Sequence, residues 1–264
     1  MGSSGGSRAI ARVRIVATCN NKGGSGKTTT TVSIASACAE RGLRVLVVDL
    51  DPQGSATAWL GGQEAPVGLV EFSAGGVPLS ALVVTSTAPG VDLIPTSPSL
   101  IPPGEEGRNE TGFAIVRGFA RLPDNWDLVL VDTPPALGYL SLAPLVACER
   151  VLIPVEGHAL GLSGVASVID SIDRARRHVN RRLELLGIVA CRVNGTSHNR
   201  QVIARLREQF GAVVLDHTVR EAVQIAEAPA SNSPITRYAP KSGVADDYRA
   251  VAVEILGRLG DLSS

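Results

Sequence analysis

The most informative segment of this 264-residue sequence is Asn21-Lys22-Gly23-Gly24-Ser25-Gly26-Lys27-Thr28-Thr29. It follows an apolar run over residues 13–19 that is typical of a buried strand, and it opens a helix-like segment over residues 28–41. Glycine permits the backbone angles that let successive N–H groups converge on an anion, and the first turn of a helix adds a favourable dipole. Strand, glycine-rich loop and helix in this order predict a loop that binds a polyphosphate.

Lysine is rare in this sequence and is concentrated in that loop. Only three lysines occur, and two of them are Lys22 and Lys27, whereas the other basic side chains are almost all arginine. A compact ammonium group suits a position among phosphate oxygens. In a loop of this kind, Lys27 is expected on the β- and γ-phosphates and Thr28 on Mg²⁺.

Two further apolar runs end in aspartate. Residues 44–54 form a β-branched run that ends in Asp49 and Asp51. Residues 126–135 form another, which ends in Asp132. Continuous apolar runs are typical of strands covered on both faces, and the carboxyl ends of such parallel strands form the ligand-binding edge of a sheet. Asp49 and Asp132 are therefore predicted to hold Mg²⁺, directly or through its water molecules.

The loop departs from the usual P-loop motif, G-x-x-x-x-G-K-[ST]. Asn21 replaces the first glycine of that motif, and a second lysine, Lys22, follows it. This arrangement resembles the deviant Walker A motif, KGGxGKT, of the ParA/MinD ATPases. The acidic segments match that family's DxDPQG and DxPP motifs at residues 49–54 and 132–135. The likeness extends from about Val13 to the last predicted helix, which is nearly the whole chain.

The resemblance implies a role for each of these residues. Lys22 would reach across a dimer interface to the ATP phosphates of the partner subunit, Lys27 would hold phosphates within its own chain, and Asp51 would orient the attacking water. The implied catalytic residues are thus Lys22, Lys27 and Asp51, the implied metal ligands are Thr28, Asp49 and Asp132, and the implied cofactors are ATP and Mg²⁺. The implied nucleotide-binding residues are Lys22, Gly23, Gly24, Ser25, Gly26, Lys27, Thr28, Thr29 and Asn194.

Two of these implications concern less conspicuous positions. Asn194 resembles the asparagine that reads adenine in relatives, although a polar residue at the end of a strand explains it nearly as well. Residues 51–54 and 133–135 would be the switch segments that sense the γ-phosphate.

The rest of the sequence alternates between strand-like and helix-like segments. Strands are expected at residues 91–95, 151–155, 185–193 and 213–216, helices at 110–122, 162–181 and 200–210, a loop at 98–109, and a long crossover with one or two short helices at 61–90. A final helix would bury Tyr248, Val251, Ile255 and Leu259. This alternation predicts an α/β fold with a doubly wound, mostly parallel sheet flanked by helices. We expect it to form a single domain over residues 11–264, after an N-terminal arm over residues 1–10 that is expected to be disordered.

Arginines gather in one part of the sequence although the formal net charge is zero. Nine arginines against two glutamates lie between Arg174 and Gln209. This excess suits the phosphate backbone of DNA, and a solvated helix face in an arginine-rich proteome is the alternative. The DNA-contacting arginines of many chromosomal relatives align with Gly195 and Gln224, so other groups would have to bind here. The candidates are Arg200, Arg205, Arg207, Arg220, Arg237 and Lys241.

Other classes of protein fit the sequence less well. The four cysteines, Cys19, Cys38, Cys148 and Cys191, are widely spaced. This spacing favours buried thiols over a zinc or iron–sulfur site and argues against an electron carrier of the nitrogenase-reductase type. Neither a membrane span nor a signal peptide is expected, and the segment from Gly257 onward is short and not basic, unlike the membrane anchor of MinD. A cytoplasmic, nucleoid-associated protein is therefore expected.

Together with the resemblance, these features predict a ParA-type Mg-ATPase that forms an ATP-dependent sandwich homodimer. It would bind DNA without sequence preference and position a chromosome, plasmid or protein cargo, with an adaptor protein resembling ParB that stimulates its slow hydrolysis. Two alternatives stay open: a MinD-like ATPase acting on a membrane or protein surface, and an ATP-dependent ligase resembling dethiobiotin synthetase. The DPQG segment and residues 227–229 favour the partition group.

Overall fold

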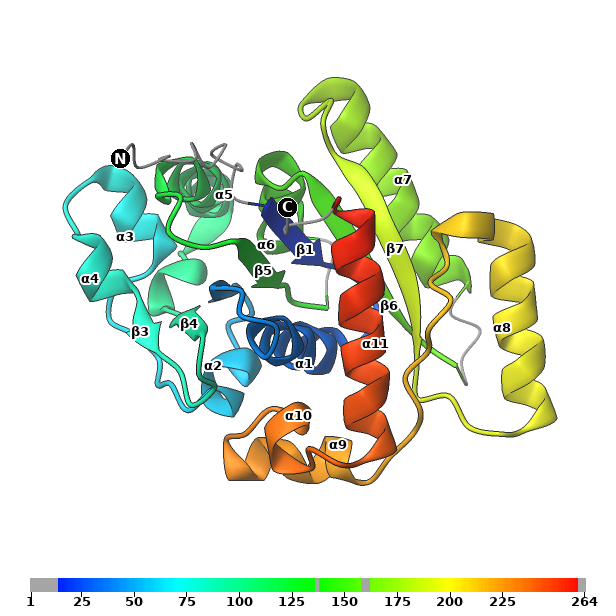
Figure 1. The fold of residues 1–264 in the computed structure, drawn as a ribbon. Helices are drawn as coiled ribbons and strands as arrows, with labels where there is room; N and C mark the ends of the chain where they lie inside the picture. The colour runs from blue at the N-terminus through cyan, green and yellow to red at the C-terminus, as the bar shows by residue number, and fades with distance from the viewer. Residues whose placement is uncertain (1–13, 136–137, 158–161, 261–264) are drawn as a thin grey trace, which may run out of the picture.

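A seven-stranded sheet forms the centre of the computed structural model, which describes residues 14–135, 138–157 and 162–260 (Figure 1). The strands follow the spatial order β3-β4-β2-β5-β1-β6-β7. Their bounds are β1 Arg14–Thr18, β2 Val45–Asp49, β3 Val84–Thr85, β4 Val91–Ile94, β5 Leu128–Asp132, β6 Arg150–Glu156 and β7 Glu184–Cys191. All neighbouring strands pair in parallel except β3 and β4. The predicted α/β fold with a mostly parallel sheet is therefore confirmed.

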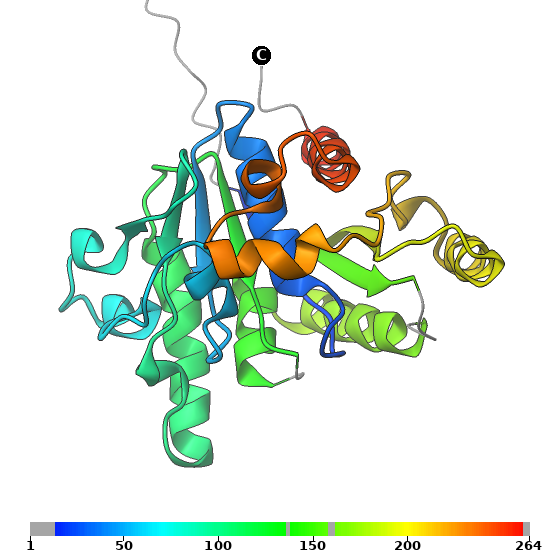
Figure 2. The ribbon, with the colours of Figure 1, turned by 90° about the horizontal axis from the view of Figure 1, so that it is seen from below.

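Helices cover both faces of this sheet (Figure 2). Successive side chains of a strand point to opposite faces. In β2, Val45 and Val47 accordingly belong to the apolar cluster that contains α1 and α11, whereas Leu46 and Val48 belong to the cluster that contains α3, α5, α6 and α7. The helices are α1 Lys27–Ala39, α2 Ser55–Trp59, α3 Leu69–Ala74, α4 Leu79–Leu82, η1 Pro98–Leu100, α5 Gly104–Arg121, α6 Tyr139–Ala147, α7 Leu162–His178, α8 Ser197–Phe210, η2 Gly211–Val213, α9 Gln224–Glu227, η3 Ala228–Ser231, α10 Ile235–Tyr238 and α11 Gly243–Arg258.

Several predicted features are confirmed. The crossover over residues 61–90 contains two short helices, α3 and α4. In α11, Tyr248, Val251 and Ile255 are buried, and Leu259 packs against the same cluster after the helix ends. All four cysteines are buried with free thiols. Among the described residues, no helix combines the length and the apolar character needed to cross a membrane. The predicted N-terminal arm lies outside the described residues.

The predicted strand at residues 213–216 is wrong. Residues 211–213 form a 3-10 turn, and Val214 makes only an isolated parallel bridge to Ile188 of β7. The next N–H groups, those of Asp216 and His217, donate hydrogen bonds to the carboxylate of Glu254 instead of to the sheet, and the chain returns to the sheet edge at a second isolated bridge, between Val193 and Arg220. A side chain of α11 thus takes the place of the next ladder partner.

The predicted loop at residues 98–109 and the predicted helix at 110–122 also need correction. α5 begins at Gly104, six residues earlier than expected, directly after Pro103 at its N-cap. Glu105 and Glu106 lie in its first turn, where negative charge interacts favourably with the helix dipole. The proline and glycine residues of this segment therefore start a helix rather than extend a loop.

Helix packing between α3 and α5 depends on Gly118. A Cβ atom at this position would lie 2.8 Å from the backbone oxygen of Leu69, which is too close. We expect Gly118→Ala to lower the free energy of unfolding by about 1–3 kcal/mol, because overpacking outweighs the gain in helix propensity. Gly112→Ala, on the same helix, is the matched control, since its Cβ would meet Tyr139 at an ordinary 3.7 Å. Urea unfolding of both variants checks this, and a Gly118→Ala protein as stable as wild type would contradict it.

Candidate nucleotide and magnesium site

The loop between β1 and α1 has the backbone of an anion-binding site. Gly24 and Gly26 have φ angles of 75° and 87°, a left-handed conformation that side chains disfavour. Gly26 is the N-cap of α1 and offers no side chain to cap it, and the first turn contains no acidic residue. The N–H groups of that turn are therefore available to an anion.

Lys27 extends into this loop from the first residue of α1. The residue is buried, and its Nζ donates a hydrogen bond to the backbone oxygen of Lys22 at 3.2 Å. Burial lowers the pKa of Lys27, while the carboxylates of Asp132 and Asp51 oppose that effect. A polyphosphate would add negative charge at the same place, so the surroundings of Lys27 fit the predicted phosphate contact.

The two predicted metal-binding aspartates lie side by side. Asp49 of β2 is in register with Asp132 of β5, and both side chains are buried. Asp132 accepts a hydrogen bond from the Thr28 hydroxyl at 2.7 Å and one from the Thr31 hydroxyl at 3.4 Å. The contact between Thr28 and Asp132 fits the prediction that they share a magnesium ion.

Asp49 is bonded mainly to the segment that follows its strand. Its Oδ1 accepts a hydrogen bond from the Asp51 N–H at 3.0 Å. Its Oδ2 accepts hydrogen bonds from both the N–H and the hydroxyl of Thr57, each at 2.7 Å. Asp49 thus accepts three hydrogen bonds from the protein, whereas Asp132 accepts two from the side chains of α1, so Asp49 fits a metal contact through water better than a direct one.

The electrostatics of this pair favour a bound cation. Burial, followed by the charge of the neighbouring Asp49, raises the pKa of Asp132 to about 8. Burial likewise raises the pKa of Asp49 to about 6, although hydrogen bonds from Thr57 oppose the rise. Two buried carboxylates at this separation do not ionise easily together unless a cation compensates them. The residues present therefore fit a divalent metal ion.

A cavity of about 250 Å³ adjoins the loop on the side of the aspartates. Its wall consists of residues 23–29 together with Asp51, Ser55 and Pro135, so both predicted switch segments reach it. The Asp51 side chain is buried, and its Oδ1 accepts a hydrogen bond from the Gln53 N–H at 3.0 Å. The structure thus places the expected water-orienting carboxylate and the phosphate-binding loop around one space.

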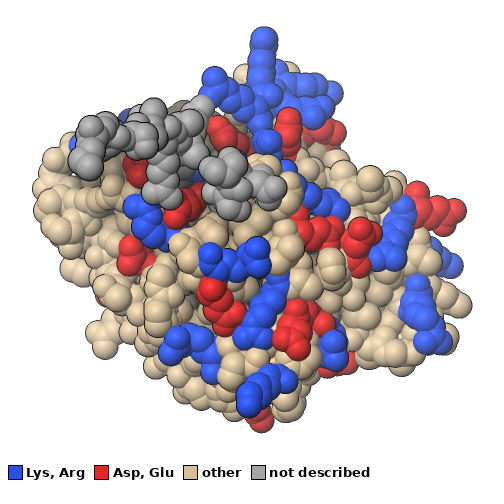
Figure 3. Space-filling model, in the orientation of Figure 1, with Lys and Arg blue, Asp and Glu red and all other residues tan. Residues whose placement is uncertain are grey.

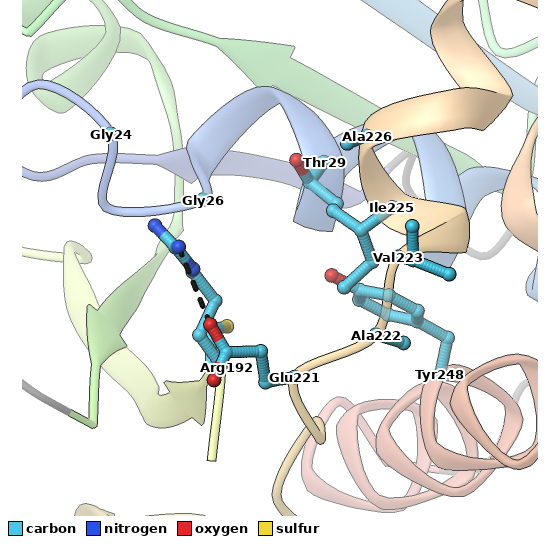
Figure 4. Close-up of a pocket in the computed structure, with 11 residues that line it drawn as sticks. Gly24, Gly26, Thr29, Arg192, Glu221, Ala222, Val223, Ile225, Ala226 and Tyr248 are labelled. Carbon is cyan, nitrogen blue, oxygen red and sulfur yellow. Dashed lines mark hydrogen bonds and ion pairs between the residues drawn. The ribbon is translucent and has the colours of Figure 1, made fainter. Parts of the chain in front are cut away.

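A second cavity, of about 390 Å³, lies on the other side of the same loop (Figure 4). It shares Gly24, Gly26 and Thr29 with the first, and its remaining lining residues are Cys191, Arg192, Glu221, Ala222, Val223, Ile225, Ala226 and Tyr248. Most of these side chains are apolar. A polar cavity and a largely apolar one that meet at a P-loop match the two ends of a nucleotide.

Sequence reasoning missed this second cavity. Its wall is brought together from α1, the end of β7, α9 and α11, which are far apart in the sequence. The only local sequence feature that could have indicated this cavity is the mainly apolar run at residues 222–226. It directly precedes residues 227–229, the segment whose sequence favours the partition group.

Asn194 lies beside this cavity and is absent from its lining residues. Its Oδ1 accepts hydrogen bonds from the N–H and hydroxyl of Thr196, the N-cap of α8. Its amide group donates a hydrogen bond to Glu221, which does line the cavity. These bonds favour a role in shaping the turn after β7, and an adenine contact stays a prediction.

Lys22 points away from the space that holds Lys27. Its Nζ lies 3.2 Å from Oε2 of Glu156, at the end of β6, and its side chain is half exposed. Glu156 also accepts a hydrogen bond from Arg192 at 2.7 Å. Lys22 lines neither the apolar nor the polar cavity of its own chain.

The predicted DNA-binding cations fall into two groups. Arg220 forms a two-pronged ion pair with Asp247, at 2.7 and 2.8 Å, which raises the pKa of Arg220. Arg200 and Arg207 donate hydrogen bonds to the backbone oxygens of Gly195 and Asp216. The side chains of three other candidates are exposed and make no hydrogen bond or ion pair within the described residues; they are Arg205, Arg237 and Lys241.

The arginine-rich part of the sequence does not form one surface. Arg174, Arg176 and Arg177 lie at the end of α7 that leads into β7, at the edge of the sheet opposite the P-loop. Arg174 and Arg176 are paired with Asp170 and Asp173 of the same helix. On the face shown in Figure 3, basic side chains gather at the top, near the end of α7 that leads into β7, and elsewhere basic and acidic side chains are interspersed.

Comparison with known proteins agrees with the class that this geometry defines, a P-loop nucleotide-binding protein. A family model described as an AAA domain matches residues 13–185. The chromosome-partitioning ATPase Soj of Thermus thermophilus is 39% identical over 250 residues, which cover 94% of this chain and 98% of that protein. The chromosome partitioning protein ParA of Caulobacter vibrioides is 31% identical over 256 residues, covering 94% and 96%.

A solved structure named cobyrinic acid a,c-diamide synthase from Mycobacterium smegmatis, with bound ADP and magnesium, is also similar. Its TM-score is 0.80 at 31% identity, covering 94% of this chain and 96% of that one. The chain therefore belongs to the ParA/MinD family of P-loop ATPases, and it is an ATPase. The expected cofactors, ATP and Mg²⁺, are confirmed at the level of the family.

The raised pKa values predict a pH dependence of stability in the absence of ligands. Folded Asp132 and Asp49 hold protons up to about pH 8 and about pH 6, whereas an unfolded aspartate releases its proton near pH 4. The folded state therefore binds more protons in this range, so stability should fall as pH rises from about 4 to about 8. Asp132→Asn should reduce this slope and be more stable than wild type near pH 8. Urea unfolding with EDTA and without nucleotide checks this, and an unchanged slope would count against it.

Proposed function

We propose that this protein is a ParA-type partition ATPase whose ATP-bound form is a sandwich homodimer that binds DNA without sequence preference. An adaptor protein resembling ParB would stimulate its slow hydrolysis, and the dimer would act on the nucleoid in the cytoplasm. The observation that carries the proposal is that Lys22 lies outside both cavities of its own chain, whereas Lys27 lines the polar cavity and donates a hydrogen bond to the backbone of the loop. The names of the Soj and ParA relatives support the partition role.

Within one chain, the loop would bind the phosphates of the nucleotide. The N–H groups of the first turn of α1 and the ammonium of Lys27 would contact phosphate oxygens. Thr28 and Asp132 would hold Mg²⁺, with Asp49 acting through water. The metal ion would neutralise charge that develops on the transferred phosphoryl group. The apolar cavity would receive the nucleoside.

Hydrolysis would depend mainly on the polar cavity. Asp51 lines it, and its carboxylate would orient the attacking water there. Phosphoryl transfer needs positioning and charge neutralisation more than covalent chemistry, so a carboxylate, a lysine and a metal ion suffice. Pro135 lines the same cavity, which supports a role for its segment in sensing the γ-phosphate.

DNA binding would rest on the cations that no acid neutralises. Arg205, Arg237 and Lys241 are the best placed of the candidates, because Arg220 is already paired with Asp247. Non-specific binding to the DNA backbone needs accessible positive charge rather than a fixed reading geometry.

An ATP-dependent ligase is the second candidate, because the similar M. smegmatis structure carries the name of an amide-forming synthase. A ligase would couple ATP consumption to an acceptor molecule, whereas a partition ATPase hydrolyses ATP without one. ATP turnover by the purified protein in the absence of any small-molecule acceptor, together with stimulation by DNA, would favour the partition role.

The two lysines of the loop should behave differently when replaced. Lys27→Ala should weaken ATP binding by at least about tenfold, since it removes a charged phosphate contact. Lys22→Ala should retain ATP binding but lose the dimer, because its ammonium would act on the partner subunit. Nucleotide titration and light-scattering mass, each with ATP, separate the two effects. An unchanged ATP-dependent mass for Lys22→Ala would remove the role across the interface.

DNA binding is best tested in a background that retains ATP. Asp51→Ala should hold a persistent ATP dimer, and that dimer should bind DNA with an affinity that falls steeply as salt increases. Adding Arg205→Ala or Lys241→Ala should weaken binding and reduce the slope of log affinity against log salt by about one. Rapid hydrolysis by Asp51→Ala would assign the water-orienting role elsewhere.

The control for these variants is Arg182→Ala, also made in the Asp51→Ala protein. It changes an exposed arginine at the edge of the sheet that is opposite the P-loop. It should bind DNA as the parent does. If it loses binding while Lys241→Ala does not, the DNA surface lies at the α7 end of the molecule. If the ATP dimer does not bind DNA even at low salt, DNA is excluded as the surface on which this protein acts.

A further inference from the structure

Arg192 has an unusual backbone conformation at the edge of the apolar cavity. β7 ends at Cys191, and the next residue, Arg192, has a φ of 55°. In the described part of the chain, Asn232 is the other residue with a side chain and a positive φ. Left-handed backbone is unfavourable for a residue that carries a Cβ, and such strain is often found at functional sites.

This turn directs the Arg192 side chain back toward the P-loop. The end of β7 already abuts the loop, since a Cβ on Gly26 would lie 3.7 Å from the Cβ of Cys191. Figure 4 shows the guanidinium of Arg192 pointing toward Gly24 and Gly26, with which it lines the apolar cavity. The side chain is 49% exposed, so its group faces an open space.

Two carboxylates hold the guanidinium in this position. Its Nη1 donates a hydrogen bond to Oε1 of Glu156 at 2.7 Å, and its Nη2 lies 3.5 Å from Oε1 of Glu221. Glu156 belongs to β6 and Glu221 to the cavity wall, so the group is anchored from two sides. Arginine has five N–H donors, and these contacts leave some of them unused. Planar guanidinium donors match phosphate oxygens well.

We propose that Arg192 is a nucleotide-binding residue that donates hydrogen bonds from its guanidinium to a phosphate of the bound nucleoside polyphosphate. This inference rests on the proposed nucleotide site, to which it adds a cation from the end of β7 that the P-loop motif does not contain. Glu156 and Glu221 are its positioning residues. The strained backbone is then explained, because a residue continuing the strand would point to a different face of the sheet.

The test compares nucleotides that differ in phosphate content. Arg192→Met should bind both ADP and ATP about tenfold more weakly in the presence of Mg²⁺, as expected for one lost charged hydrogen bond. Binding of adenosine, measured by competition, should not change. Arg44→Met is the matched control, because Arg44 is an exposed arginine ion-paired with Asp127 at 3.1 Å and lines neither cavity. It should bind all three ligands as wild type does.

A second variant separates lost contact from misfolding. Glycine adopts a φ of 55° without strain, so Arg192→Gly should melt at or above the temperature of the wild-type protein. It should nevertheless show the same loss of ADP and ATP affinity. Wild-type affinity in both Arg192 variants would overturn the proposal. Lys27→Ala, measured in parallel, shows whether the nucleotide site itself is correctly assigned, because its failure to weaken binding would refute the proposed function instead.

A double variant distinguishes direct contact from charge neutralisation. Suppose that Arg192 acts only by compensating the negative charge of its neighbours. Its loss would then matter mainly at Glu221, because Glu156 would keep its ion pair with Lys22. Arg192→Met combined with Glu221→Gln would then recover wild-type affinity for ADP, and that recovery would overturn the proposal. Continued weak binding in the double variant is the result that direct contact requires.

Discussion

The parallel register of β1, β5 and β2 fixes the positions of the groups on which the site depends. The ladders place Thr18 beside Asp132 and Asp132 beside Asp49. Because α1 follows β1 through a short loop, Thr28 reaches Asp132 directly. Burial of two neighbouring carboxylates costs free energy, and the register does not allow them to separate. A bound cation would relieve that cost, and stability would then be linked to metal binding.

Hydrogen bonds extend from the buried aspartates toward the other end of the proposed nucleotide site. Thr57 donates to Asp49 and accepts a hydrogen bond from the N–H of Thr96, so the first turn of α2 is fixed against β2 and β4. At the end of α2, the indole N–H of Trp59 donates to the backbone oxygen of Ser233 at 2.8 Å. That oxygen follows η3, which continues from α9 in the wall of the apolar cavity. The polar and apolar ends of the site are thus parts of one bonded framework.

The sequence allows prediction of those parts of the site that lie within single segments. Loop residues 23–29 and the aspartates at strand ends are recognisable because their expected roles depend on a local order of strand, loop and helix. The apolar cavity and the position of Arg192 depend on elements far apart in the chain, and no spacing rule reveals them. The wrong strand at residues 213–216 has a similar cause, because Glu254 of a distant helix takes the hydrogen bonds that a ladder would have used.

The two edges of the sheet are protected in different ways. β3 covers one edge with only two residues, paired in the antiparallel sense with β4. Beyond β7, residues 213–220 run alongside the other edge with isolated bridges at Val214 and Arg220. Neither edge therefore presents a long row of free backbone groups on which a strand of another molecule could assemble. Self-association by sheet extension is thereby disfavoured.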